Sequence, residues 1–464
     1  MVKKKNYDVI IVGAGPAGIF TALELVKSGK KLDILMLEKG RSLKERDCPM
    51  KSRNINCIKC PSCAVVSGWG GAGAFSDGKL TLSTEIGGHM PEYIGKEKLA
   101  EYIKKADDIY LQFGARDKIY GISPEKAEEI ADRAIMANLK FIPARLRHLG
   151  TGYSKVVLQG MMDYLIENGV EVVLGQRVVE LLAENGRIKG VKLKDGTILE
   201  SRYVTVAPGR ENAEWLSKEA ARLGIDMAIN PVDIGVRVEL PAAIMKNLTD
   251  EIYESKLVFY SKKFEDKVRT FCMCPNGEVV QENNQGLITV NGHTHSHIKT
   301  KNTNFALLVS KTFTEPFKEP ITYGRYIASL ANMIGGGVIV QKLGDLLSGR
   351  RSTEDRIQRG LVEPTLKDAT PGDLSLVFPH RFLEAIVEML EALDKLSPGV
   401  YNRDTLLYGV EVKFYSSRLK VNNNLETQIE NLYTGGDGAG ITRGLMQASV
   451  SGMVIADDIV RKES

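Results

Sequence analysis

The chain has 464 residues, of which 43% are hydrophobic, and this length is enough for two domains with substantial cores. Its formal net charge of +4 is small for that length, so charge gives no support for a nucleic-acid or membrane-surface partner. No apolar run reaches the roughly 18–20 residues of a membrane span. The basic start, Lys3-Lys4-Lys5, resembles a secretory leader, but Asp8 and a glycine-rich turn interrupt the apolar stretch. We therefore expect a cytoplasmic protein.

The first forty residues contain a strand, a glycine-rich turn and a helix in immediate succession. Residues 8–12 are apolar and rich in β-branched side chains, and Gly13-x-Gly15-x-x-Gly18 follows at once, before a helical pattern. This order is typical of a dinucleotide-binding turn, in which the glycines allow a tight bend and bring a pyrophosphate close to the helix N-terminus. A second strand, residues 32–37, ends in Glu38, which we expect to accept hydrogen bonds from the adenosine ribose.

Three later features favour FAD over NAD as the dinucleotide. Residues 170–206 have the pattern of strands joined by Asn185-Gly186 and Asp195-Gly196, the strongest two-residue hairpin signals. This pattern resembles the β-meander in the FAD domains of glutathione-reductase-type flavoproteins. The run Val204–Gly209 resembles their second glycine-bearing motif, and Thr434–Asp437 resembles the terminal motif, whose Asp binds the ribityl chain. The resemblance implies one FAD held between the two ends of the chain.

The helix that follows this terminal motif is expected to act on the flavin. Its pattern predicts a cap at Thr442 and an end near Val460. Its N-terminus, near Arg443, Gly444 and Leu445, is expected to point at the flavin pyrimidine edge, where the helix dipole would stabilise the anionic reduced flavin by about 0.3–2 kcal/mol. Arg443 either adds a full positive charge there or is a surface residue of the first turn.

Four further segments resemble a single family across nearly the whole chain. They are the glycine-rich Ser67–Lys79, then Arg147–Thr151, Val232–Glu239 and Arg269–Pro275. Their order and amino-acid sequences resemble those of the bacterial and archaeal FAD-dependent dehydrogenases (NAD(P)/FAD-dependent oxidoreductases) of unassigned substrate. These proteins are related to geranylgeranyl-reductase-like flavoproteins. The resemblance implies an α/β fold, with a Rossmann-like FAD-binding domain of glutathione-reductase type and a second, mixed α+β substrate domain.

Because the FAD motifs lie at both ends, the FAD-binding domain is expected to be discontinuous, with residues 1–85, 145–231 and 400–464. Residues 86–144 have polar helical patterns and are expected to form a helical insertion. Residues 232–399 are the expected substrate or cap domain. Within it the patterns predict strands at 232–240 and 286–291 and helices near 303–315, 324–334 and 380–395.

Four of the six cysteines, Cys48, Cys57, Cys60 and Cys63, lie within a span of 16 residues. Cys57-x2-Cys60-x2-Cys63 has ferredoxin-like spacing, although the closing Cys-Pro is missing after Cys63 and only Cys48-Pro49 is available upstream. Three alternatives stay open. The group binds an iron–sulfur cluster that feeds electrons to FAD, or Cys60 and Cys63 form a redox dithiol, or all are reduced thiols in a loop.

Three residues are candidates for catalysis. His148 is a candidate proton donor, because histidine can exchange the proton that accompanies hydride transfer. Arg147 could hold a substrate carboxylate bidentately, and Lys79 could contact the cofactor or balance its charge. The structural alternatives are a hydrogen-bonded histidine, a surface arginine and a solvated lysine. Cys272 and Cys274 would share one face of a strand, and either line the pocket or fill core.

The expected cofactor contacts are Gly13, Gly15, Pro16, Ala17, Gly18, Glu38, Lys39, Gly70, Gly71, Ala72, Val178, Ala207, Gly209, Gly436, Asp437, Arg443, Gly444 and Leu445. Together these features predict an FAD-dependent oxidoreductase that transfers a hydride between flavin N5 and a small organic substrate. Only one dinucleotide fingerprint is present, so we expect NAD(P)H at most as a transient donor, or an electron-donor protein. An iron–sulfur-linked electron-transfer flavoenzyme, a flavin-dependent tRNA-modifying enzyme and a flavin-free carrier remain as alternatives. The charge balance shows no basic surface for tRNA.

Overall fold

The computed structural model describes residues 2–49, 53, 60, 62–75, 78–121, 123–149, 153–252, 256–284, 286–294, 299–314, 316–317, 319–414 and 417–464. The chain divides into two compact units. Unit 1 comprises Met1–Ile119, Arg145–Ala228 and Ser416–Ser464, and unit 2 comprises Tyr120–Ala144 and Ile229–Tyr415. Unit 1 is therefore built from both ends of the chain.

Unit 1 is organised around a mixed sheet with the order β7-β2-β1-β10-β9-β8, in which β22 also pairs with β10. Strand β1 lies inside the sheet, parallel to both β2 and β10, and its side chains from Val9 to Val12 are buried, as an inner parallel strand requires. The sheet strands are β1 (Asn6–Val12), β2 (Ile34–Glu38), β7 (Glu171–Leu174), β8 (Val178–Glu184), β9 (Arg187–Leu193), β10 (Ile198–Val206) and β22 (Leu432–Thr434).

The predicted meander is present as strands β8, β9 and the first half of β10, which pair antiparallel. Asn185 and Gly186 join β8 to β9 with φ angles of 51° and 74°. Positive φ at both central residues is what a two-residue type I′ turn needs, and Asn and Gly adopt it most readily. The hairpin signal in the sequence is thus confirmed by the backbone.

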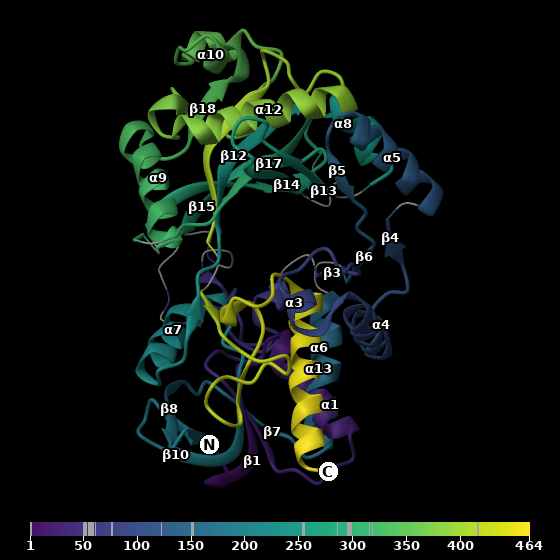
Figure 1. Ribbon diagram of the computed structural model, residues 1–464, viewed down its shortest axis with the longest axis vertical. Helices are drawn as coiled ribbons and strands as arrows, with labels where there is room; N and C mark the ends of the chain where they lie inside the picture. The colour runs from purple at the N-terminus through teal and green to yellow at the C-terminus, as the bar shows by residue number, and fades with distance from the viewer. Residues whose placement is uncertain are drawn as a thin grey trace. The chain divides into compact units, whose positions relative to one another are not determined.

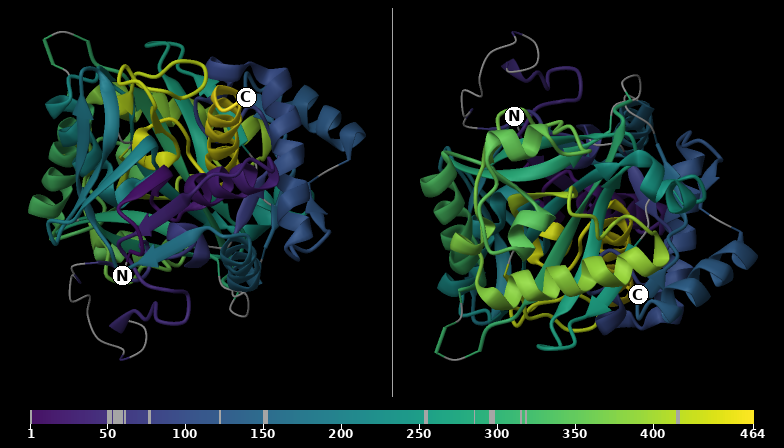
Figure 2. Two further views of the ribbon diagram at one scale, coloured as in Figure 1. Left: turned by 90° about the horizontal axis from the view of Figure 1, so that it is seen from below. Right: turned by 90° about the horizontal axis from the view of Figure 1, so that it is seen from above.

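Two helices from opposite ends of the chain pack side by side in unit 1, α1 (Pro16–Lys27) and α13 (Leu445–Lys462) (Figures 1 and 2). A Cβ atom at Gly452 would lie 2.1 Å from the carbonyl oxygen of Ala17, so only glycine allows this approach. Thr21 Oγ1 donates to the Gly452 carbonyl at 3.1 Å. The other elements of unit 1 are β3 (Lys79–Thr81), α3 (Met90–Ile94), α4 (Lys96–Gln112), β6 (Leu146–His148), α6 (Tyr153–Glu167), α7 (Ala213–Arg222), β11 (Met227–Ala228) and β21 (Arg418–Leu419).

Unit 2 is built on an eight-stranded sheet with the order β19-β18-β20-β12-β17-β14-β13-β5. Its central strands are antiparallel, and side chains such as Val236 and Val238 of β12 join an apolar core with helix α12. The elements are α5 (Pro124–Met136), β5 (Lys140–Ile142), β12 (Val232–Pro241), α8 (Ala242–Thr249), β13 (Lys256–Tyr260), β14 (Lys267–Cys274), β15 (Glu278–Asn284), β16 (Leu287–His293), β17 (Asn302–Lys311), α9 (Pro320–Gly335), β18 (Ile339–Lys342), α10 (Leu343–Leu347), α11 (Glu354–Gln358), β19 (Thr370–Pro371), α12 (His380–Leu396) and β20 (Leu406–Lys413).

The structure corrects three expectations about layout. Residues 400–414, expected in the FAD-binding domain, belong to unit 2, where Leu406–Lys413 forms β20. Residues 86–144 do not form an insertion of their own: α4 packs on α13 within unit 1, whereas α5 and β5 belong to unit 2. Residues 303–315 are not a helix, because Asn302–Lys311 forms β17 between β12 and β14. Eight of its ten residues are buried, and a short apolar run of this kind cannot be assigned to helix or strand from periodicity alone.

Candidate functional site

The glycine-rich turn of unit 1 follows β1 and leads into α1. Gly13 has a φ of 106°, and a Cβ atom there would lie 2.2 Å from the Ala207 carbonyl oxygen. A Cβ at Gly18 would lie 2.0 Å from the Gly13 carbonyl oxygen. These two glycines are therefore required by the packing of the turn itself, as the sequence predicts.

Gly15 is different, because the protein gives no internal reason for a glycine there. Its φ of −83° is open to any residue, and a Cβ atom at this position would meet no heavy atom within 4 Å. It is the N-cap of α1, where backbone N–H groups have no partner within the helix. The space beside Gly15 is thus open, next to the positive end of a helix dipole.

Glu38, at the end of β2, ties three segments of this site together. Its Oε2 accepts from the Ala14 amide at 3.0 Å, and its Oε1 accepts from the Gly40 and Gly68 amides at 2.8 and 3.0 Å. The carboxylate is only 8% exposed, so these charge-assisted bonds compensate its burial. The acid expected to bind ribose therefore also fixes the shape of the turn.

The second glycine loop, Gly68–Gly71, lies directly against the first. The Gly70 amide donates to the Ala14 carbonyl at 2.8 Å, and a Cβ at Gly71 would lie 3.2 Å from Gly15 Cα. Ala72, which continues the loop, is exposed. The Gly68–Gly71 loop and the Gly13–Gly18 turn therefore meet through backbone contacts.

A buried arginine holds this second loop. Arg46 donates to the carbonyls of Ala64, Val65 and Trp69 at 2.7–2.8 Å. Burial lowers the pKa of Arg46 to about 10, so the guanidinium remains charged near neutral pH. Sequence reasoning missed Arg46, because nothing in its local pattern separates it from a surface arginine.

The C-terminal motif closes the site from the other side. A Cβ at Gly436 would lie 3.3 Å from Ala17 Cβ, so this motif contacts the start of α1. Asp437 Oδ2 accepts from Arg210 Nε and Nη2 at 3.0 and 2.7 Å. Its Oδ1 accepts from Thr442 Oγ1 at 2.7 Å and from the Gly444 amide at 3.0 Å. The C-terminal motif thus meets the glycine-rich turn that follows β1.

Several other predicted contacts lie around this centre with roles within the protein. Ala207 and Gly209 pack against the two turns: the Ala207 amide donates to Val12 at 2.8 Å, and a Cβ at Gly438 would meet the Gly209 carbonyl oxygen at 2.3 Å. Lys39 Nζ forms an ion pair with Glu211 at 2.8 Å, and a Cβ at Gly73 would lie 2.6 Å from a methyl group of Leu445. Val178 lies in the apolar core of unit 1.

The predicted cap of α13 is wrong. The helix begins at Leu445 with Gly444 as its N-cap, at a φ of 139°. Thr442 does not cap the helix, and its hydroxyl donates to Asp437 instead. Arg443 lies between them, with its amide donating to the Gly87 carbonyl at 2.6 Å.

The structure also corrects the role of Arg147. Its guanidinium is 2% exposed and donates to both carboxylate oxygens of Asp107, at 2.7 and 2.8 Å, and to the Arg116 carbonyl at 2.7 Å. These acceptors belong to the protein, so Arg147 forms an internal ion pair rather than a carboxylate site for substrate. Residues 150–152, which continue this motif, lie outside the described residues.

Lys79 and His148 occupy directly opposite positions on the antiparallel strands β3 and β6. Opposite residues of such a pair extend to the same face, so the two side chains are neighbours. Sequence reasoning treated them separately, since nothing in the sequence indicates that these short strands pair.

His89 is a further titratable group that sequence reasoning missed. Its Nδ1 lies 2.6 Å from Glu92 Oε1, and its Nε2 is buried without a hydrogen-bond partner among the described residues. The His89 amide donates to the Ile441 carbonyl at 2.8 Å, which brings His89 to the segment leading into α13. Burial lowers the pKa of His89, with further lowering from Arg418 and Arg443, although the bond to Glu92 opposes this.

Three of the four clustered cysteines are described. Cys48, Cys60 and Cys63 are each half-buried, and Cys57 lies outside the described residues. Cys63 directly precedes the segment held by Arg46, and its carbonyl accepts from the Ser67 amide at 2.9 Å. The cluster is therefore adjacent in the chain to the Gly68–Gly71 loop.

Unit 2 contains a buried ionic network on the face of β12 opposite its apolar core. Arg237 and Glu411 are both fully buried and 3.4 Å apart, and Arg237 also donates to Asn304 at 2.8 Å and to Cys274 Sγ at 3.2 Å. Cys272 and Cys274 were expected to share one face of a strand, and their side chains do interact with each other and with Arg237. They do so although β14 has a bulge there and Cys272 has a φ of 46°. Only Cys274 is buried.

Comparison with known proteins identifies the class. Residues 231–414 match the family model described as "FAD-dependent protein, C-terminal domain-like". This match confirms the predicted recognition of an FAD-dependent protein and FAD as its cofactor. Because flavin chemistry is oxidation and reduction, the chain is a flavin-dependent oxidoreductase. Among the described residues, none of the helices has the length and apolar composition to span a membrane.

The individual proteins that resemble this chain share less than 30% sequence identity with it. A Clostridium beijerinckii protein described as uncharacterized is 28% identical over 486 residues, 98% of this chain and 80% of that protein. Digeranylgeranylglycerophospholipid reductase 2 of Methanococcoides burtonii is 27% identical over 237 residues, 50% of this chain and 43% of that protein. The crystal structure of L-proline dehydrogenase from P. horikoshii has a TM-score of 0.44 at 14% identity, covering 99% of this chain and 95% of that one.

Proposed function

We propose that unit 1 binds FAD in the manner of glutathione-reductase-type flavoproteins and that the protein transfers a hydride between flavin N5 and a small organic substrate. The observation that carries the proposal is the open space at Gly15, with Gly71 beside it and Gly436 against Ala17. Two distant segments thus approach the start of α1 at Gly15 and Ala17. Glycines at these positions leave room for a pyrophosphate against the N-terminus of α1.

We assign a group of the protein to each part of the dinucleotide. Amides at Gly15 and the start of α1 are the proposed pyrophosphate donors, Glu38 the ribose acceptor and Asp437 the acceptor for the ribityl chain. The N-terminus of α13 adds a positive dipole end near Gly444. When bound, FAD supplies the hydride chemistry, and the protein supplies orientation and electrostatics.

Replacing Asp437 tests the C-terminal half of this cradle. Asp437→Ala removes the acceptor of Thr442 and Gly444 and the partner of Arg210. We expect FAD binding to weaken by about tenfold or more, because bonds to a charged group contribute roughly 1.5–3 kcal/mol each. Fluorescence titration of apoprotein with FAD measures this. Asp108→Ala on the exposed side of α4 is the matched control, and equal affinity in both variants would refute the role of Asp437.

Two histidines are the proposed proton carriers, His148 beside Lys79 and His89 beside Glu92. A hydrogen bond from Nδ1 to Glu92 leaves Nε2 of His89 as a proton acceptor. His148→Gln and His89→Gln separate them by their pH profiles. In the variant that lacks the true proton carrier, flavin reduction should be about 10²–10⁴-fold slower. Its rate should also no longer depend on the ionisation of that histidine.

The lowered pKa of His89 also predicts how stability depends on pH. An unfolded histidine binds a proton near its ordinary pKa of about 6.5, whereas folded His89 resists protonation to lower pH. As the pH falls from about 7.5 to about 5.5, the unfolded chain gains protons first and the free energy of unfolding decreases. His89→Gln should make that decrease smaller in urea titrations, and an unchanged slope would contradict the assignment.

Substrate turnover is tested on FAD-loaded protein without oxygen. The half-chain similarity to a digeranylgeranylglycerophospholipid reductase makes isoprenoid double bonds the first substrates to assay. Reoxidation of the reduced flavin by such a substrate, with stoichiometric loss of the double bond, would support the proposal. An iron assay on the same sample distinguishes the alternative of a cluster at Cys48, Cys57, Cys60 and Cys63, which requires stoichiometric iron. Flavin that reacts with no organic substrate but exchanges electrons with that iron would favour the alternative.

A further inference from the structure

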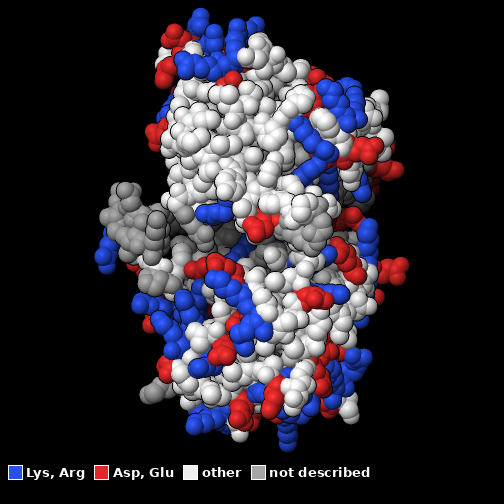
Figure 3. Space-filling view, turned by 60° about the vertical axis from the view of Figure 1, so that its left-hand side comes forward, with Lys and Arg blue, Asp and Glu red and all other residues white. Residues whose placement is uncertain are grey.

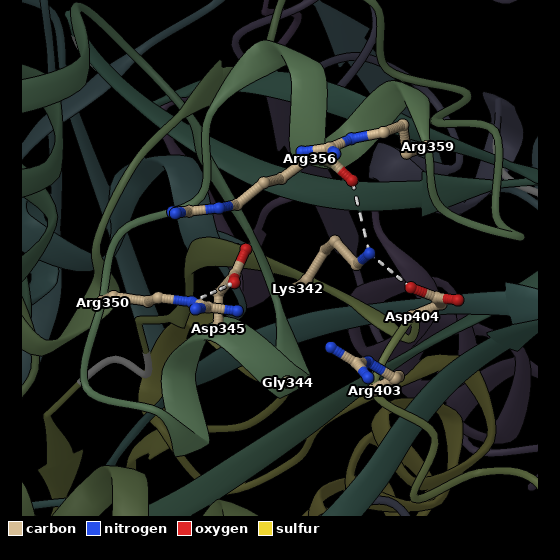
Figure 4. A pocket seen from close by; sticks show the side chains of 8 residues that line it. All are labelled: Lys342, Gly344, Asp345, Arg350, Arg356, Arg359, Arg403 and Asp404. Carbon is tan, nitrogen blue, oxygen red and sulfur yellow. Dashed lines mark hydrogen bonds and ion pairs between the residues drawn. The ribbon is translucent and has the colours of Figure 1, made fainter.

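Unit 2 has a hollow of about 560 Å³ that the proposed flavin chemistry does not use. It is lined by side chains from the end of β18, from α10 and α11 and from the turn before β20 (Figure 4). Figure 3 shows Lys and Arg side chains gathered on the part of unit 2 where α10 lies in Figure 1. The lining residues are Lys342, Gly344, Asp345, Arg350, Arg356, Arg359, Arg403 and Asp404.

The walls of this pocket are fixed by the backbone. The Gly344 amide donates to the Arg403 carbonyl at 2.9 Å, and a Cβ at Gly344 would lie 2.7 Å from Arg403 Cβ. Asp345, which is 4% exposed, accepts from Arg350 Nε at 2.8 Å and from Ser352 Oγ at 2.7 Å. Glycine at position 344 thus allows α10 and the Arg403 turn to meet, and Asp345 anchors the Arg350 loop.

The charges in the pocket do not balance. Asp345 is paired with Arg350, and Asp404 is paired with Lys342, which also donates to the Arg356 carbonyl. Five basic and two acidic side chains line the pocket, so three positive charges remain. In the described part of the chain, no carboxylate lies within 4.0 Å of the guanidinium groups of Arg356, Arg359 or Arg403. Figure 4 shows the Lys342–Asp404 pair between the arginines of the α11 segment and Arg403.

We propose that this pocket binds a small molecule through a diphosphate group. The net charge of +3 on the lining complements the charge of a diphosphate monoester, and the planar donors of arginine bind phosphate oxygens in pairs. The volume exceeds that of a lone ion, since one water occupies about 30 Å³ in the liquid, so the rest of the molecule also has room. The chemistry is shared by nucleoside diphosphates and isoprenyl diphosphates. The site is separate from the residues proposed to hold FAD.

Calorimetric titration of the FAD-loaded protein tests this proposal, because a filled flavin site does not compete for the probes. Inorganic pyrophosphate, ADP and an isoprenyl diphosphate are the three probes, and sulfate is the comparison anion. We expect at least one diphosphate to bind more tightly than sulfate, with an affinity that falls steeply as salt is added. The tighter binder of ADP and the isoprenyl diphosphate shows whether the diphosphate belongs to a nucleotide or to an isoprenoid.

Arg403→Gln is the main variant, because the side chain is exposed and its backbone contacts are unaffected. We expect about tenfold weaker binding, and a larger loss when Arg356→Gln is added. Arg351→Gln removes one positive charge at an exposed position next to Arg350 that does not line the pocket. Equal losses in Arg403→Gln and Arg351→Gln would overturn the proposal, as would failure of every diphosphate to bind the unaltered protein. An unchanged flavin spectrum and melting temperature verify that each variant is folded.

Discussion

Replacing Gly15 by leucine is expected to abolish FAD binding while leaving the chain folded. The φ of −83° suits leucine, and no heavy atom lies within 4 Å of the new Cβ, so the first atom of the side chain fits the apoprotein. The side chain would instead fill the space proposed for the pyrophosphate. Loss of two charge-assisted bonds from backbone amides costs about 3–6 kcal/mol, which weakens FAD at least about a hundredfold.

The measurement is the flavin content of the purified variant together with its urea unfolding curve. Gly160→Ala, in helix α6, is the control, because a Cβ there meets only Phe113, at an ordinary 3.5 Å. Gly18→Ala is the opposite case, since its Cβ would lie 2.0 Å from a carbonyl oxygen and should destabilise the fold itself. A yellow Gly15→Leu protein with normal FAD content would refute the placement of the dinucleotide at this turn.

Removing Arg147 is expected to destabilise unit 1 strongly. Arg147→Met leaves the Asp107 carboxylate, which is 12% exposed as a side chain, without its bidentate partner. An uncompensated buried charge costs about 3–5 kcal/mol, and the free energy of unfolding should fall by that amount.

A double variant separates this structural role from catalysis. Arg147→Met combined with Asp107→Leu replaces the ion pair with apolar side chains and should recover most of the lost stability, because well-packed apolar replacements of buried pairs are often neutral. If the single variant keeps its stability but loses the ability to turn over substrate, Arg147 contacts substrate and the ion-pair account is wrong.

The parts of the fold with strong local chemistry could be predicted from sequence. The dinucleotide turn, the Asn185-Gly186 hairpin and helix α12 all follow from short-range rules, because glycine geometry and apolar periodicity act within a few residues. Strand β17 could not be predicted in this way. Its apolar run fits a helix equally well, and only pairing with β12 and β14 makes it a strand.

The site shows the same division. That Gly13 and Gly18 must be glycine is a local property, and the sequence predicts both. Arg147 beside His148 suggested a substrate site, but its partner, Asp107, lies 40 residues earlier on α4. His89 and Arg46 were missed for the same reason, since their importance comes from contacts made across unit 1 and not from neighbours in sequence.

The central claim is that one FAD is held where the two ends of the chain meet, and cofactor stoichiometry tests it most directly. The absorbance spectrum of the purified protein, followed by denaturation and quantification of the released cofactor, should give one FAD per chain. A colourless protein that takes up no flavin when titrated with FAD would contradict the claim, however well the chain is folded.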